Sequence, residues 1–195
     1  MKGLLGVATV LLGVLTGVSG WAKETATPDS APKAGSPESA AQTAMVAMKK
    51  GDWGAYTHGM HPEALAKAKE MFGAVVANDA SGRVGQLFFG VQSPGAFDAL
   101  SDSASFVAFM TNLTREFPMF GEVMRTAEFD VIGTLREGAE LAHIVYRAGA
   151  KAEDLAITKT AVLTMRRHGD EWRMLLAANI EGLASRLPQL TGSKP

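Results

Sequence analysis

Residues 126–148 read TAEFDVIGTLREGAELAHIVYRA, and this segment has the pattern of a β-hairpin. Strand-forming side chains lie on both sides of the turn signal Glu137-Gly138. A second tight connection, His168–Glu171, joins two further segments of the same kind. The predicted strands are residues 126–135, 141–148, 157–167 and 172–179. Because the turns between them are short, we expect an antiparallel meander.

The residues before these strands follow a helical spacing instead. Ser36 is suited to cap a helix that begins at Pro37, since proline favours the first helical position. Gly51 ends this helix, and Asp52 can cap a short second one. The apolar face of the first helix comprises Ala41, Ala44, Met45 and Met48.

Further elements follow before the meander and after it. A third helix opens at His61-Pro62-Glu63 and ends in the turn residues 78–82. Residues 84–91 predict a strand, residues 102–118 a fourth helix, and residues 180–187 a short closing helix. The order of helices, strand, helix and four strands predicts an α+β fold, with helices packed on one face of a bent antiparallel sheet.

The N-terminus has the features of a secretory signal peptide over residues 1–22. Lys2 is basic, residues 4–18 are mostly apolar, and Gly20 and Ala22 suit a cleavage site. The apolar run is short for a transmembrane helix, which needs about 20 residues. We therefore expect a secreted or periplasmic protein without a membrane anchor after cleavage.

The composition divides the remaining chain and excludes several classes of site. Residues 23–36 predict a flexible linker, residues 37–190 one domain, and residues 191–195 a disordered tail. The absence of cysteine excludes disulfides, thiolate metal sites and a cysteine nucleophile. A net charge of −1 gives no reason to expect nucleic acid as a partner. No phosphate-loop or dinucleotide glycine pattern is present, so we expect no cofactor and no metal.

The order of elements resembles the NTF2-like superfamily, also called SnoaL-like or ketosteroid-isomerase-like. The resemblance covers residues 37–180 and includes the helix break Lys49-Lys50-Gly51-Asp52-Trp53, His61-Pro62-Glu63 and the final Asp170-Glu171-Trp172-Arg173. It implies a cone-shaped domain whose helices and sheet enclose an apolar pocket, and a homodimer formed through the sheet. It implies no particular activity, because the fold hosts enzymes and non-catalytic domains alike.

Several side chains are candidates for a pocket or for catalysis. Isomerases of this family use a carboxylate base with a tyrosine and a protonated aspartate, for which Tyr56 and Asp130 are the available positions. His58, with His61 and Glu63, has residue types of a metal or acid–base cluster, whereas the structural alternative is that these residues cap or flank the third helix. The ligand-pocket candidates are Tyr56, His58, Phe109, Asp130, Tyr146 and Trp172.

Alternation along the second predicted strand leaves two arrangements open. His143 and Arg147 share one face and Tyr146 lies on the other. Either the histidine and arginine line the pocket, or they are solvated and Tyr146 points inward. For Trp172 and for the apolar cluster around Phe109, core packing is the alternative to a role in the pocket.

Three functions are consistent with these residues. The first is non-catalytic binding of a small apolar ligand or a protein partner, which we favour. The second is an isomerase or dehydratase that uses pocket residues such as Tyr56, His58 or Asp130, and it requires these side chains to converge. The third is a structural role in the cell envelope, which requires an exposed apolar sheet face.

Overall fold

The computed structural model describes residues 33–152, 155–176 and 187. The predicted signal peptide, the tail and most of the linker and of the closing helix lie outside these residues. Leu187 belongs to the described part, where it is helical and fully buried. Among the described helices, none combines the length and apolar character that a membrane span needs.

Three N-terminal helices begin and end where the sequence predicts. They are α2 (Pro37–Lys50), α3 (Trp53–His58) and α4 (Pro62–Asn78). The Ser36 hydroxyl accepts a hydrogen bond from the Ser39 N–H at 3.2 Å, and the Asp52 carboxylate accepts one from the Ala55 N–H at 2.9 Å. Gly51 ends α2 with a φ of 69°, a left-handed conformation that glycine adopts without strain.

The strand predicted over residues 84–91 is wrong. Residues Gly85–Phe89 form the short π-helix η1, followed by α5 (Pro94–Asp98). The apolar run pairs with no strand in the described chain; instead Phe88 and Phe89 are buried against other phenylalanine rings. A short apolar run has no period that separates a buried strand from a buried helical turn, and here tertiary packing decides.

The fourth predicted helix is confirmed as α6 (Asp102–Glu116), but a further helix follows it. Pro118, which ends α6 as predicted, also begins α7 (Pro118–Thr126). Proline suits the first helical position because the amide hydrogen it lacks would have no partner there. As a result the first strand begins at Glu128 rather than at Thr126.

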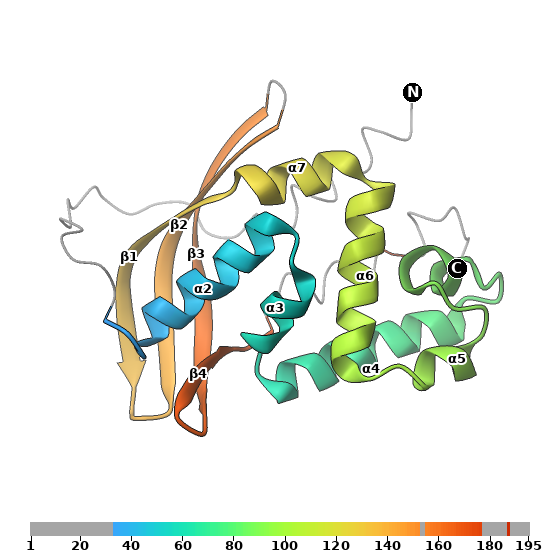
Figure 1. The fold of residues 1–195 in the computed structure, drawn as a ribbon, viewed down its shortest axis with the longest axis horizontal. Coiled ribbons are helices and arrows are strands. Elements are labelled where there is room, and N and C mark those ends of the chain that lie inside the picture. Colours follow the sequence, from blue (N-terminus) through green and yellow to red (C-terminus); the bar gives the residue numbers. More distant parts are fainter. Residues whose placement is uncertain (1–32, 153–154, 177–186, 188–195) are drawn as a thin grey trace.

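The C-terminal strands form the predicted antiparallel meander (Figure 1). They are β1 (Glu128–Glu137), β2 (Leu141–Ala152), β3 (Leu155–His168) and β4 (Glu171–Met174), paired in this order. The last strand is shorter than predicted and ends at Met174 rather than Asn179. At Met174 the backbone also bonds to the helical part of the protein, since the Met174 carbonyl accepts a hydrogen bond from the His61 N–H at 2.8 Å.

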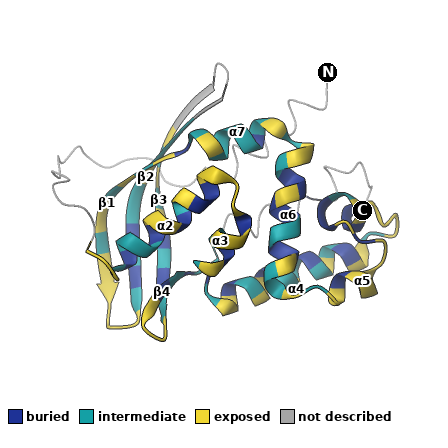
Figure 2. Ribbon diagram, viewed as in Figure 1, coloured by how far each residue is buried: buried dark blue, intermediate teal, exposed yellow. Residues whose placement is uncertain are grey.

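The protein is thus α+β, with its helices preceding a four-stranded sheet. Helix α2 lies across one face of the sheet, and α4, α5 and α6 form a separate helical layer beside it (Figure 1). We call the sheet face toward α2 the inner face and the opposite one the outer face. Buried residues follow the inner face and the contacts between helices (Figure 2).

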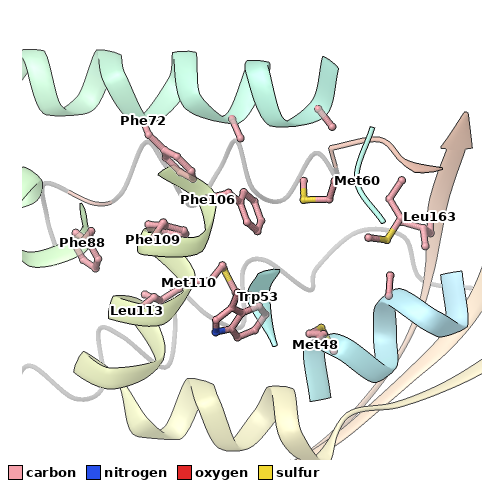
Figure 3. Packing of buried hydrophobic residues seen from close by; sticks show 14 of the residues in the cluster. Met48, Trp53, Met60, Phe72, Phe88, Phe106, Phe109, Met110, Leu113 and Leu163 are labelled. Carbon is pink, nitrogen blue, oxygen red and sulfur yellow. The ribbon is translucent and has the colours of Figure 1, made fainter. Parts of the chain in front are cut away.

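The helical layer contains a cluster of phenylalanine rings (Figure 3). Phe109 of α6 is fully buried and its ring centroid lies 4.5 Å from that of Phe72 of α4. It also lies 5.9 Å from Phe88 and 5.8 Å from Phe89. Aromatic pairs at these separations add to the stabilisation from burial alone.

Replacing Phe109 by alanine should therefore lower the free energy of unfolding by about 3 to 5 kcal/mol, the range for large aromatic truncations in cores. Urea denaturation followed by circular dichroism measures this loss. The control is Val46→Ala, on an α2 side chain that is 50% exposed, which should change stability by no more than about 0.5 kcal/mol. Equal, small effects of both substitutions would contradict the assignment of Phe109 to the core.

Candidate functional site

A cavity of about 240 Å³ lies between α2 and the inner face of the sheet. Its walls are mostly apolar, and polar groups come from only a few positions. The lining residues are Ala41, Gln42, Met45, Val46, Lys49, Ala127, Phe129, Val131, Ile144, Tyr146 and Leu163. We call this space the α2–sheet cavity.

Two regular patterns place these side chains around the cavity. Ala41, Met45 and Lys49 follow one another at intervals of four residues, so they form a row on one face of α2. On the sheet, Ile144 and Tyr146 alternate with residues that point outward. Phe129 and Val131 do the same on β1 before the bulge that follows Val131.

The structure decides between the two arrangements of β2. Ala142 and Ile144 are buried on the inner face, and Tyr146 lies on the same side and lines the cavity. His143 lies on the outer face, where its imidazole contacts the Thr164 hydroxyl at 3.1 Å and the Glu137 carboxylate at 3.2 Å. Arg147 is exposed on that face as well.

Asp130 is also on the outer face, directly across the β1–β2 pairing from Arg147. Both residues are exposed, and neither lines the cavity. The reason is alternation: the neighbours of Asp130, Phe129 and Val131, point inward, so the carboxylate between them points outward. Asp130 therefore is not in position to act on a ligand in the α2–sheet cavity.

Tyr56 of α3 lies among aromatic rings and does not line the cavity. Its ring centroid is 6.1 Å from that of Phe106, in a stacked arrangement, and 6.0 Å from that of Trp53, edge to face. Burial raises the pKa of Tyr56 to about 12, and the nearby Tyr146 phenol adds to this increase. Burial also raises the pKa of Tyr146. Both phenols are therefore neutral at physiological pH and able to donate hydrogen bonds.

The histidines near the third helix do not form a cluster at the cavity. His58 is exposed at the end of α3, whereas His61 caps α4, its Nδ1 accepting from the Glu63 N–H at 3.3 Å. The ring of His61 also packs edge to face on that of His168, with centroids 5.3 Å apart. Among the described residues no three histidine, aspartate or glutamate side chains are grouped so that they could hold a metal ion.

Phe109 and Trp172 also lie away from the cavity. Phe109 faces the helical layer, because its side of α6 packs on α4 and η1. Trp172 of β4 is buried at the other end of the sheet. There the guanidinium carbons of Arg136 and Arg167 lie 5.5 and 5.3 Å from its ring centroid, within the range of cation–π attraction.

Of the residues that we predicted for a pocket, the structure thus brings only Tyr146 to the wall of this cavity. The structure also shows lining residues that we did not predict from the sequence, above all Met45, Lys49 and Leu163. The helix row of Ala41, Met45 and Lys49 was a signal that could have been found in the sequence. The sheet residues could not, because their facing depends on the register and the bulge.

No protein-family model and no curated protein matches this chain. Among solved structures, the chain is similar to an NTF-2 like protein of unknown function from Shewanella oneidensis MR-1. The two are 14% identical, with a TM-score of 0.40, over 71% of this chain and 91% of that one. The description of that protein names the superfamily that the sequence resembles, and nothing about this chain's function follows from it.

The burial of Tyr56 predicts a loss of stability in alkaline solution. Above pH 10 the unfolded chain ionises this phenol, while the folded protein keeps it neutral up to a pKa of about 12. Stability from the neutral phenol is therefore complete below pH 10 and is lost as the pH rises to 12, with about 1.4 kcal/mol lost by pH 11. Tyr56→Phe should lack this loss when urea unfolding is compared at pH 8, 10 and 11.

Tyr146→Phe is the comparison variant for this experiment, since burial raises the pKa of Tyr146 without the additional neighbour effect. It should reduce the alkaline loss by a smaller amount than Tyr56→Phe. If wild type and Tyr56→Phe lose stability equally between pH 8 and 11, the Tyr56 phenol is not withdrawn from water as described.

Proposed function

We propose that this protein is a non-catalytic, exported domain that binds a small, largely apolar ligand in the α2–sheet cavity. The observation that carries the proposal is the cavity itself, which is lined by apolar side chains of α2 and of three strands. Transfer of an apolar molecule from water into an apolar cavity of this kind is favourable. Protein interiors otherwise contain few voids larger than a water molecule.

The volume limits the size of the ligand. An apolar protein cavity of about 150 Å³ accommodates benzene, which has six carbon atoms. In proportion, the 240 Å³ of the α2–sheet cavity accommodates about ten non-hydrogen atoms. Two fused rings, or an alkyl chain of similar size, are therefore ligands of the right bulk.

The catalytic alternative lacks the convergence that it needs. A general acid or base has to reach the reacting atoms within hydrogen-bond distance. Asp130 lies on the outer face and His58 is exposed at the end of α3, so neither shares the cavity with Tyr146. Tyr56 does not line the cavity either, because its ring packs against Trp53 and Phe106.

Export is supported by residues 1–22, whose basic start, apolar run and small residues suit a signal peptide. In this proposal the domain that follows acts in the periplasm or outside the cell. Its stability there rests on the apolar core, since the chain has no cysteine and hence no disulfide.

A homodimer through the outer face of the sheet is a second candidate role. Two large apolar side chains are exposed there, Leu135 at 68% and Val162 at 55%. Val162 pairs directly with Val145 of β2, so the apolar residues are neighbours across the strands. Contiguous exposed apolar surface of this kind is typical of association surfaces.

Ligand binding in the α2–sheet cavity is tested by a substitution on β1 that places a larger side chain in the cavity. Naphthalene, with ten carbon atoms, is the probe, and its fluorescence reports binding. Val131→Phe places a larger side chain in the cavity wall and should lower the affinity at least about tenfold. If the larger side chain keeps two carbon atoms of the probe out of the cavity, the affinity falls by about 1.6 kcal/mol, at about 0.8 kcal/mol for each carbon. This loss corresponds to a factor of at least about ten.

Val162→Phe makes the same substitution on the outer face and should leave naphthalene binding unchanged. Circular dichroism confirms that both variants fold. Two results would contradict the proposal: no binding by the wild-type protein, or equal binding by Val131→Phe and wild type.

Self-association is tested separately by sedimentation velocity. The double variant Leu135→Lys and Val162→Lys places charges on the outer face and should convert a dimer to a monomer, because burying unpaired charge is costly. Gln92→Lys, at an exposed position outside the sheet, should leave the dimer intact. A wild-type protein that is monomeric at 100-fold different concentrations, on the order of micromolar to 0.1 mM, would contradict this role.

A further inference from the structure

The charged group in the wall of the α2–sheet cavity indicates what kind of ligand enters it. Lys49 is the cationic residue of the lining, and no acidic residue accompanies it there. Its ammonium group forms no ion pair with any residue in the part of the chain that the structure describes. A cation beside an apolar cavity, with no acidic residue among the described residues that line it, favours a ligand that supplies the negative charge.

The position of Lys49 on α2 separates it from its neighbour. Lys49 and Lys50 are both exposed, but only Lys49 continues the row of Ala41 and Met45 and lines the cavity. Both lysines lie in the last turn of α2, where positive charge interacts favourably with the helix dipole. The helix dipole therefore favours lysine equally at positions 49 and 50. Only the lysine at position 49 also lies at the cavity.

Lys49 is exposed, so its ammonium group lies at the solvent side of the cavity. Long basic side chains extend apolar methylene groups over apolar surface and keep the charge in water. The remaining wall, toward the sheet, is formed by Phe129, Ile144 and Leu163. The site is therefore amphipathic, with charge at its edge and hydrocarbon inside.

We infer that the α2–sheet cavity binds an amphipathic carboxylic acid, with the hydrocarbon part inside and the carboxylate at the Lys49 ammonium. This inference rests on the proposed function and specifies its ligand class. The volume, which holds about ten non-hydrogen atoms, suits a medium-length alkyl chain. The neutral Tyr146 phenol on the same wall is a further donor for a ligand oxygen.

Isothermal titration calorimetry with three ten-carbon probes tests the inference on the full domain. Decanoate, 1-decanol and decylammonium share the alkyl chain and differ in the charge of the head group. Decanoate should bind more tightly than 1-decanol, and decylammonium more weakly than either. Lys49→Gln should weaken decanoate binding about two- to fivefold, the range for an exposed ion pair, and leave 1-decanol binding unchanged.

Lys50→Gln is the matched control, since it removes the same charge from the same helix turn and should leave all affinities unchanged. The preference for decanoate should also decrease as the salt concentration rises, because exposed charges are screened.

Each other outcome overturns the inference in a recognisable way. Equal affinities for the three probes would show that the cavity binds hydrocarbon without selecting charge, which leaves the proposed function intact. A loss of 1-decanol binding in Lys49→Gln as large as the loss of decanoate binding would show that Lys49 contributes only its methylene groups. Binding of none of the probes would contradict the proposed function together with this inference.

Discussion

The arrangement of the whole molecule depends on one backbone connection between the helices and the sheet. The Met174 N–H donates to the Gly59 carbonyl at 2.7 Å, and the Met174 carbonyl accepts from the His61 N–H at 2.8 Å. Met60 and Met174 are paired in this way as an isolated parallel bridge, and both side chains are buried. The junction of α3 and α4 is thereby fixed to the end of β4. A Cβ at Gly59 would lie 3.1 Å from the Ala44 Cβ, so any other residue there would need Ala44 of α2 to shift by a few tenths of an ångström.

This connection helps to explain why a cavity remains between α2 and the sheet. Large aromatic side chains are concentrated in the helical layer, where Phe72, Phe89 and Phe109 pack on one another. The face of α2 toward the sheet carries no aromatic residue; it presents Ala41, Met45 and Lys49 to the cavity. Once the α3–α4 junction is attached to β4, α2 is held across the inner face, and the cavity remains between its side chains and Ile144 and Leu163 of the sheet. The proposed ligand would occupy this space between α2 and the sheet.

Sequence analysis predicted the features that local chemistry determines. Ser36, Gly51, Asp52 and His61 end or begin helices as expected, since a cap depends on a few adjacent residues. The antiparallel meander was predictable as well, because short turns with glycine at positive φ leave few other pairings. The helical conformation of residues 85–89 could not be predicted in the same way. It depends on phenylalanine rings that come from α4, α5 and α6.

The candidate site was predictable only in part, for a related reason. Alternation showed that Tyr146 and His143 lie on opposite faces, but only the burial of Ala142 and Ile144 shows which face is inner. Asp130 was a candidate in the sequence but does not line the cavity, whereas Lys49 was not a candidate and does line it. A charge on an exposed helix is ordinary in a sequence, and it gains meaning from the cavity that the fold places beside it.

The proposed function depends on the α2–sheet cavity being an open, apolar space in the folded protein. A crystal structure determined under xenon pressure tests this claim most directly, because xenon binds in apolar cavities through dispersion attraction alone. If the cavity is open, we expect xenon density between α2 and the inner face, in contact with Ile144 and Leu163. A structure in which side chains of α2 fill this space, with no xenon bound there, would contradict it.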